Sequence, residues 1–266
     1  MTATLEGRDL VLGYQGTTVV HGVSVRLEPG RVTALIGPNG SGKSTVLRSL
    51  ARLHRTEAGS VAVDDVDAAP LSAKEFARRV TLLSQSRPHP SGLEVRDVVA
   101  FGRHPHRGRF AGISDADRAA IDHAMSVTGV DRMSDRPVDQ LSGGELQRVW
   151  LATCLAQDTD VVLLDEPTNH LDLRYQVETL DLVRDLADDH GTALGVVLHD
   201  LNHAATVADQ VVLLHQGTVR AVGAPADVLT AEHLSDVYGL PIRCLLDPET
   251  GAVRVDAQGR HHQRRR

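Results

Sequence analysis

The residues Gly37-Pro38-Asn39-Gly40-Ser41-Gly42-Lys43-Ser44 lie between an apolar run, Val32–Ile36, and a helical pattern, Thr45–Leu53. A glycine, four residues and then Gly-Lys-Ser, placed between a strand and a helix, is the pattern of a phosphate-binding loop. The glycines let the backbone wrap so that amide groups point at phosphate oxygens, and the helix N-terminus adds positive potential. We predict that this loop binds a nucleoside triphosphate, with Lys43 on the β- and γ-phosphates and Ser44 on Mg²⁺.

An acidic pair, Asp165 and Glu166, follows a second apolar run, Val161–Leu164. A buried strand that ends in a carboxylate places Asp165 at the edge of a sheet, where it can help to hold Mg²⁺. Glu166 comes one residue later, so its side chain points elsewhere, and we expect it to act as general base on the attacking water. A glycine-rich turn with a chance lysine and an acidic turn after a strand are the alternatives, which the pairing of the two patterns disfavours.

The rest of the chain alternates between short apolar runs and helical patterns. This alternation predicts an α/β fold with a mostly parallel sheet covered by helices on both faces. Strand-like runs in the first thirty residues predict an additional β layer. The middle of the chain is expected to form a helical insertion. The later elements expected are strands at Val80–Leu83, Ala193–Leu198 and Gln210–Leu214, and helices at Val95–Arg103, Asp115–Thr128, Glu145–Ala156, Leu173–His190 and Leu201–Ala208.

Length and composition exclude several classes of protein. The 266 residues, 41% of them hydrophobic, suit one large or two small domains with a sizeable core. A formal charge of −7 argues against a general nucleic-acid binder, so no nucleic-acid partner is expected. The apolar runs are too short to span a bilayer, and the N-terminus does not resemble a signal peptide. With only Cys154 and Cys244, a reduced, cytosolic chain is expected.

A second glycine-bearing turn opens a helix at Leu141-Ser142-Gly143-Gly144-Glu145-Leu146-Gln147-Arg148, twenty residues before the strand at Val161. The start of that helix is a second potential anion site. This segment resembles the signature motif of the ATP-binding-cassette (ABC) ATPases, and the resemblance covers most of the chain. It implies a P-loop NTPase (RecA-like) fold with an N-terminal antiparallel layer and an inserted helical subdomain at about 88–157. It also implies a head-to-tail homodimer, in which residues 141–145 contact the ATP bound by the other copy.

The same resemblance assigns roles to further residues of this chain. Gln85 matches the glutamine that reaches Mg²⁺, and His199 matches the switch histidine that contacts the γ-phosphate and the attacking water. Asp172 matches the carboxylate of a dimer-contact loop. Tyr14 is placed like the aromatic that stacks on adenine, and Thr45 completes the expected ATP-binding residues. The ATPase domain is expected at 3–239, followed by a short C-terminal extension, 240–266, with a basic tail expected to be disordered.

Within the family, Phe101-Gly102-Arg103-His104-Pro105-His106 resembles a Gly-Arg-x-Pro-His stretch of ATPases that serve importers of iron–siderophores, haem and vitamin B12. The resemblance implies an ATPase at the cytoplasmic face of the membrane, coupled to integral permease subunits and, indirectly, to a substrate-binding protein. We expect iron(III)-siderophore complexes as the cargo, with haem or cobalamin as the alternatives. A soluble ABC ATPase outside transport and a nucleotide-dependent binding module that hydrolyses ATP poorly are the competing functions.

Overall fold

The computed structural model of the protein describes residues 3–85, 90–108, 111–249 and 251–259. Its centre is a six-stranded sheet in the order β10-β9-β3-β8-β7-β6, in which only β10 runs antiparallel to its neighbour. The mostly parallel sheet is therefore confirmed. The strands are β3 (Val32–Ile36), β6 (Val80–Leu83), β7 (Val161–Asp165), β8 (Ala193–Val197), β9 (Gln210–His215) and β10 (Thr218–Gly223).

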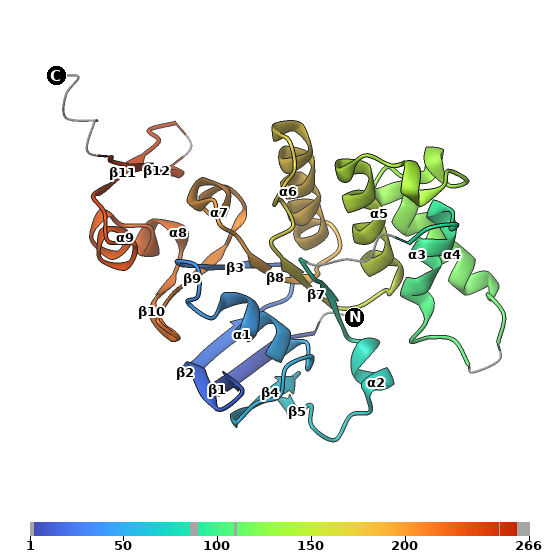
Figure 1. Ribbon diagram of the computed structural model, residues 1–266, viewed down its shortest axis with the longest axis horizontal. Coiled ribbons are helices and arrows are strands. Elements are labelled where there is room, and N and C mark those ends of the chain that lie inside the picture. Colours follow the sequence, from blue (N-terminus) through green and yellow to red (C-terminus); the bar gives the residue numbers. More distant parts are fainter. Residues whose placement is uncertain (1–2, 86–89, 109–110, 250, 260–266) are drawn as a thin grey trace.

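A second, antiparallel sheet in the order β2-β1-β4-β5 lies below the first in Figure 1. It is the predicted N-terminal β layer, although its strands are longer than the apolar runs indicated. Helix α1 lies between this layer and the central sheet, while α6 and α7 lie on the other side of the central sheet (Figure 1). The bounds are β1 (Leu5–Tyr14), β2 (Thr17–Leu27), β4 (Ala58–Val63), β5 (Val66–Asp67), α1 (Lys43–Leu50), α6 (Leu173–Asp188) and α7 (Leu201–Val207).

Alternating side chains of β3 build both cores. Val32, Ala34 and Ile36 belong to the apolar cluster that contains α6 and α7, whereas Leu35 belongs to the cluster of α1 and the N-terminal sheet. Successive side chains of a strand point to opposite faces, and all five residues of β3 are buried. The prediction that helices cover both faces of the sheet is confirmed.

The helical insertion lies between β6 and β7 along the chain and has its own apolar cluster (right in Figure 1). Its predicted start near residue 88 lies outside the described residues. A short helix, α2 (Ala73–Ala77), precedes β6. The insertion contains α3 (Val95–Ala100), η1 (Phe101–Arg103), α4 (Asp115–Val127), η2 (Asp131–Met133), η3 (Val138–Gln140) and α5 (Gly143–Ala156).

The C-terminal part has more structure than the sequence indicated. After β10 come two helices and a two-stranded antiparallel hairpin, at the left of Figure 1. The basic tail was expected to be disordered, but its residues 260–266 lie outside the described residues. The C-terminal elements are α8 (Pro225–Val228), α9 (Ala231–Tyr238), β11 (Ile242–Leu246) and β12 (Val253–Ala257).

Candidate active site

The phosphate-binding loop joins β3 to α1 and needs its glycines. Gly37 has φ 140°, and a Cβ at this position would lie 2.0 Å from the carbonyl oxygen of Leu214. Gly42, with φ 101°, is the N-cap of α1, where no side chain caps the helix and no acidic residue occupies the first turn. In the part of the chain that the structure describes, the first amide groups of α1 therefore have no side-chain acceptor, which suits an anion.

Lys43 is buried at the start of α1 and lies against the loop. Its ammonium donates to the carbonyl oxygens of Gly37 (2.8 Å) and Pro38 (3.0 Å). Burial lowers the pKa of Lys43, while the neighbouring carboxylates of Glu166 and Asp165 oppose that shift. In the described part of the chain, no salt bridge pairs this ammonium with a carboxylate, so the cation faces the loop.

The remaining loop residues differ in exposure. Asn39 and Gly40 are exposed at the tip of the loop, whereas Ser41 is buried. Among the described residues, the Ser41 hydroxyl has no hydrogen-bond partner. A buried polar atom without a partner is costly, so a ligand in the loop would be a natural partner for it.

Ser44 and Asp165 are brought together from positions 121 residues apart. The Ser44 hydroxyl donates to Asp165 Oδ1 at 2.7 Å, and Asp165 is fully buried at the end of β7. Burial raises the pKa of Asp165, which the hydrogen bond from Ser44 counteracts. Its second oxygen, Oδ2, has no hydrogen-bond partner among the described side chains and backbone groups, and the Arg48 guanidinium lies 3.6 Å away. A buried carboxylate oxygen beside a hydroxyl fits the oxygen ligands that Mg²⁺ prefers.

Glu166 is held by three side chains, two from other segments of the chain and one from its own turn. Gln85 Nε2 donates to Glu166 Oε2 at 2.6 Å, and Asn169 Nδ2 donates to the same oxygen at 3.0 Å. His199 Nε2 lies 2.5 Å from Glu166 Oε1. Glu166 itself has φ 55°, a left-handed conformation that non-glycine residues rarely adopt and that often marks functional sites.

The sheet topology explains this convergence. Strands β6, β7 and β8 are parallel neighbours, so Gln85, Glu166 and His199 all follow the carboxyl ends of adjacent strands. Ligands of open α/β sheets bind at this edge. Sequence reasoning predicted these three residues but not the contact made by Asn169. The sequence indicates the Asn169 contact only through the position of this residue, three residues after Glu166 and in a turn.

Tyr14 lies beside the loop at the end of β1. Its hydroxyl is 3.4 Å from the Thr45 hydroxyl in the first turn of α1, and 46% of the residue is exposed. One side of the ring packs on His54, with 4.5 Å between the ring centroids. An exposed aromatic next to the phosphate-binding loop is compatible with a base-stacking platform.

The signature turn forms a capping box at the start of α5. The Ser142 hydroxyl accepts the Glu145 amide, and Glu145 Oε2 accepts the amide (2.8 Å) and the hydroxyl (2.9 Å) of Ser142. These bonds lower the pKa of Glu145, with a further contribution from Arg136 at 2.9 Å. Leu141, just before the cap, is half-buried. Among the described residues, no hydrogen bond joins this turn to the phosphate-binding loop.

Two side chains that the sequence did not reveal connect the signature helix to the rest of the site. Gln147 of α5 donates to the carbonyl oxygen of Pro167, next to Glu166, at 2.6 Å. Tyr175 packs on Gly144, where an added Cβ would lie 2.4 Å from its ring. Asp172 caps α6 by accepting the amide of Tyr175 at 3.0 Å. The expected dimer-contact residue and the signature turn are thus linked through Tyr175.

The Gly-Arg-x-Pro stretch has an internal structural role. Gly102 packs on α5, since a Cβ there would lie 2.1 Å from the Thr153 carbonyl oxygen. Arg103 is buried, pairs with Asp117 at 2.8 Å and donates to the Ala156 carbonyl oxygen at 2.9 Å. These contacts fasten η1 to α4 and α5, so Gly102 and Arg103 help to hold the helical insertion together.

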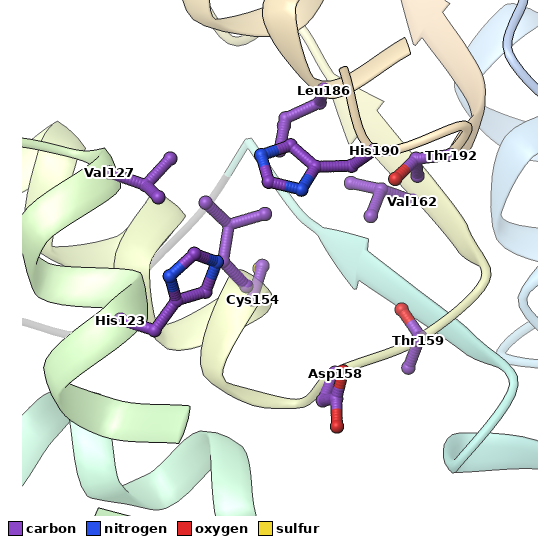
Figure 2. Close-up of a pocket in the computed structure, with 10 residues that line it drawn as sticks. His123, Val127, Cys154, Asp158, Thr159, Val162, Leu186, His190 and Thr192 are labelled. Carbon is purple, nitrogen blue, oxygen red and sulfur yellow. The ribbon is translucent and has the colours of Figure 1, made fainter. Parts of the chain in front are cut away.

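A small cavity contains none of the predicted site residues, and Figure 2 shows His123, Cys154 and His190 among the side chains that line it. Its volume is about 100 Å³. Within the described residues, neither Cys154 nor Cys244 is in a disulfide bond. Within the described ranges, no group of three or more His, Cys, Asp or Glu side chains could hold a metal ion. Nor is any helix in those ranges both long and apolar enough to cross a bilayer.

The fold and the loop define a P-loop nucleotide-binding protein, and comparisons specify its family. Residues 20–169 match the family model of the ABC transporter. The chain is 44% identical to the achromobactin transport ATP-binding protein CbrD of Dickeya dadantii, covering 93% of this chain and 92% of that one. It is 42% identical to the ferric enterobactin transport ATP-binding protein FepC of Escherichia coli, covering 97% and 95% of the two chains.

A solved structure supports the same fold. The ADP conformation of MJ1267, an ATP-binding cassette of an ABC transporter, matches with a TM-score of 0.80 and 20% identity, covering 90% of this chain and 99% of that one. The chain belongs to the ATP-binding proteins of the ABC transporter family, which are ATPases. The predicted family, fold and ATPase activity are confirmed, whereas the roles of individual site residues stay predictions.

Proposed function

We propose that this chain hydrolyses ATP to power an importer of iron(III)-siderophore complexes, with Glu166 as general base. The observation that carries the catalytic part is the carboxylate of Glu166, held by Gln85, Asn169 and His199 at the edge of the sheet. A base must be fixed within hydrogen-bond reach of the water that it activates. His199, in contact with Glu166, is placed to orient the same water and to sense the γ-phosphate.

The phosphates would be bound by residues 37–45, and the adenine would stack on Tyr14. Lys43 would move its ammonium from the loop carbonyls to the phosphates, which are stronger acceptors. We propose Ser44, Asp165 and the amide oxygen of Gln85 as the residues that hold Mg²⁺. Bound there, Mg²⁺ would neutralise charge on the phosphate oxygens.

We further propose that two copies assemble head to tail. The chain has one phosphate-binding loop, and the signature turn belongs to the separate helical insertion. Residues 141–145 would therefore contact the ATP of the second copy, with Asp172 beside the interface. Loss of the γ-phosphate after hydrolysis would remove these contacts and open the dimer, a two-state switch biased by a ligand.

The proposed membrane partner would bind at a surface groove between α2 and the segment after η1. The groove has a volume of about 650 Å³, and its lining includes Ala77, Pro105 and Ala111 together with Lys74 and Arg107. Apolar side chains flanked by cations suit a short amphipathic helix that carries acidic residues. A permease helix in this groove would place the ATPase at the cytoplasmic face of the membrane, with a substrate-binding protein acting through the permease.

The choice of siderophore cargo rests on relatives that span nearly the whole chain. CbrD and FepC are both named for siderophores, achromobactin and ferric enterobactin. The proposed site binds nucleotide and partner subunits and does not contact the cargo. Haem and cobalamin are therefore distinguished by transport measurements and not by the residues of this site.

Uptake by intact cells tests the proposal. Cells that carry Glu166→Gln in place of the natural chain should lose uptake of radioactive iron bound to siderophore, while an exposed-site control, Glu232→Gln, keeps it. Unchanged siderophore uptake would contradict the proposal, and a selective loss of haem or cobalamin uptake would reassign the cargo. Stimulation of the purified ATPase by nucleic acid, but not by permease in lipid, would instead support a function outside transport.

A further inference from the structure

The proposed switch residue, His199, lies on a short connection between β8 and α7. Before it, the amide of Leu198 donates to the Leu35 carbonyl oxygen at 3.2 Å and continues the sheet. After it, Asp200 caps α7 by accepting the amides of Asn202 (2.7 Å) and His203 (3.2 Å). The sheet thus fixes the backbone before His199, whereas the backbone after His199 depends on the position of α7.

Helix α7 has only seven residues, so its position must come from tertiary contacts. Helices of this length are not stable by themselves in water. Ala204 and Val207 are buried against the core of the sheet and seat one side of the helix. In the first turn, which is nearest to His199, Leu201 is only partly buried against the same core.

The C-terminal hairpin adds a polar contact to this first turn. Asn202 Nδ2 donates to the carbonyl oxygen of Val255 at 3.2 Å, and the Val255 amide donates to Asn202 Oδ1 at 2.8 Å. A side-chain amide has the donor and the acceptor that such a two-bond pairing with a strand requires. The pairing joins residues 53 positions apart in the sequence.

The register of the hairpin leaves Val255 free to make this pairing. The bonds Gln258 N to Pro241 O and Asp247 N to Ala252 O fix which positions of β11 and β12 bond to each other. In an antiparallel pair these positions alternate, so the amide and carbonyl of Val255 point away from β11. Asn202 therefore takes a place that a further strand would otherwise occupy.

The hairpin is itself anchored in the protein. Ile242 and Val253 are buried in the same apolar cluster as α7. Just before the hairpin, burial raises the pKa of Tyr238 to about 12, and the backbone of Gly37, the first glycine of the phosphate-binding loop, opposes this shift. The C-terminal segment thus bonds to α7 and also lies near the phosphate-binding loop.

We propose that the hairpin β11–β12 positions His199, with Asn202 as the positioning residue that transmits the contact. Displacing the first turn of α7 would move His199 away from Glu166 without touching the nucleotide-binding loop. The inference rests on the proposed role of His199 in hydrolysis. Because Asn202 is exposed to solvent, the expected effect is moderate.

The test compares Asn202→Ala and Asn202→Asp with Arg254→Ala, an exposed residue of β12 next to Val255. Asn202→Ala should lower kcat about two- to tenfold, the scale of a hydrogen bond or two, and leave KM for ATP nearly unchanged. Asn202→Asp keeps the acceptor but cannot donate to the Val255 carbonyl oxygen, so kcat should fall as well. The control should keep both constants.

A second readout separates positioning from general destabilisation. The ring resonances of His199 in NMR spectra, identified by their loss in His199→Gln, should shift in both Asn202 variants and not in Arg254→Ala. A lower Tm with unchanged kcat and unchanged His199 resonances would overturn the proposal. If His199→Gln hydrolyses ATP normally, the proposed role of His199 is wrong, and the resonances alone then decide whether the hairpin sets its position.

Discussion

The two glycine-bearing turns of this chain both lead into helices. The backbone amides in the first turns of α1 and α5, however, differ in their hydrogen bonding. At α1 the N-cap is Gly42, with no side-chain cap and no acidic residue, and a lysine opens the helix. At α5, Ser142 and Glu145 bond to each other's backbone and close the helix end within the chain. The same local motif therefore has an open form and a self-capped form.

The difference indicates two kinds of anion contact. The open end of α1 has amide donors without side-chain acceptors beside a buried cation, so it should bind a triphosphate by itself. The closed end of α5 is complete without a ligand. Its Ser142 hydroxyl must turn away from Glu145 to reach a phosphate, so we expect it to add contacts only to a nucleotide that is already bound.

The largest expected effect tests whether the open end of α1 and the closed end of α5 meet in a dimer. Glu166→Gln should lower turnover by on the order of 10²–10⁴-fold, the usual contribution of a general base, while keeping ATP binding. It should also accumulate a dimer in the presence of ATP and Mg²⁺, measured by size-exclusion chromatography. A variant that stays monomeric under these conditions would remove α5 from the nucleotide site of a second copy.

The next effect concerns the open end alone. Lys43→Ala should weaken ATP binding by on the order of 100-fold, because it removes a charge-assisted contact to the phosphates. Isothermal titration calorimetry measures the affinity. Lys74→Ala, which changes the only other lysine of the chain, is the matched control and should bind normally. Equal affinity in both variants would place the phosphates elsewhere.

A smaller effect concerns the closed end. Ser142→Arg should bind ATP with normal affinity but turn over on the order of tenfold more slowly, because its bulk keeps the second copy away from the bound nucleotide. The measurements are ATP affinity and steady-state ATPase rate. Ser126→Arg, at an exposed position of α4, should keep both. Full activity of Ser142→Arg would mean that the capping box only stabilises the helix.

The smallest effect is a loss of stability in acid at the closed end, where a carboxylate completes the cap. The folded pKa of Glu145 lies below its unfolded value, which is about 4.3, so the cap stabilises the fold above that pH. This stability is lost as the pH falls through the folded pKa. Glu145→Gln should therefore cost about 0.5–1 kcal/mol in the free energy of unfolding at pH 7 and progressively less below pH 4.

Denaturant titrations at several pH values measure this difference, with Asp181→Asn, an exposed carboxylate of α6, as control. The control should leave the free energy of unfolding nearly unchanged at every pH. A difference between Glu145→Gln and the natural chain that does not shrink in acid would show that the carboxylate is not what the cap depends on.

Much of the candidate site could be predicted because its motifs are local. The spacing from Gly37 to Ser44 and the acidic end of the Val161–Asp165 strand each follow from neighbouring residues and the strand that precedes them. The contacts of Asn169 and Tyr175 could not be predicted in this way. They depend on how a turn and a helix are oriented after the sheet has formed.

By itself, the sequence determined the phosphate-binding loop, the parallel sheet and the family. Each of them follows from the spacing of nearby residues and from the period of buried side chains. Only the tertiary structure decided that Gln85, Glu166 and His199 converge and that Val255 pairs with Asn202. The physical reason is that strand order and hairpin register join residues many positions apart, and local propensity carries no information about such pairings.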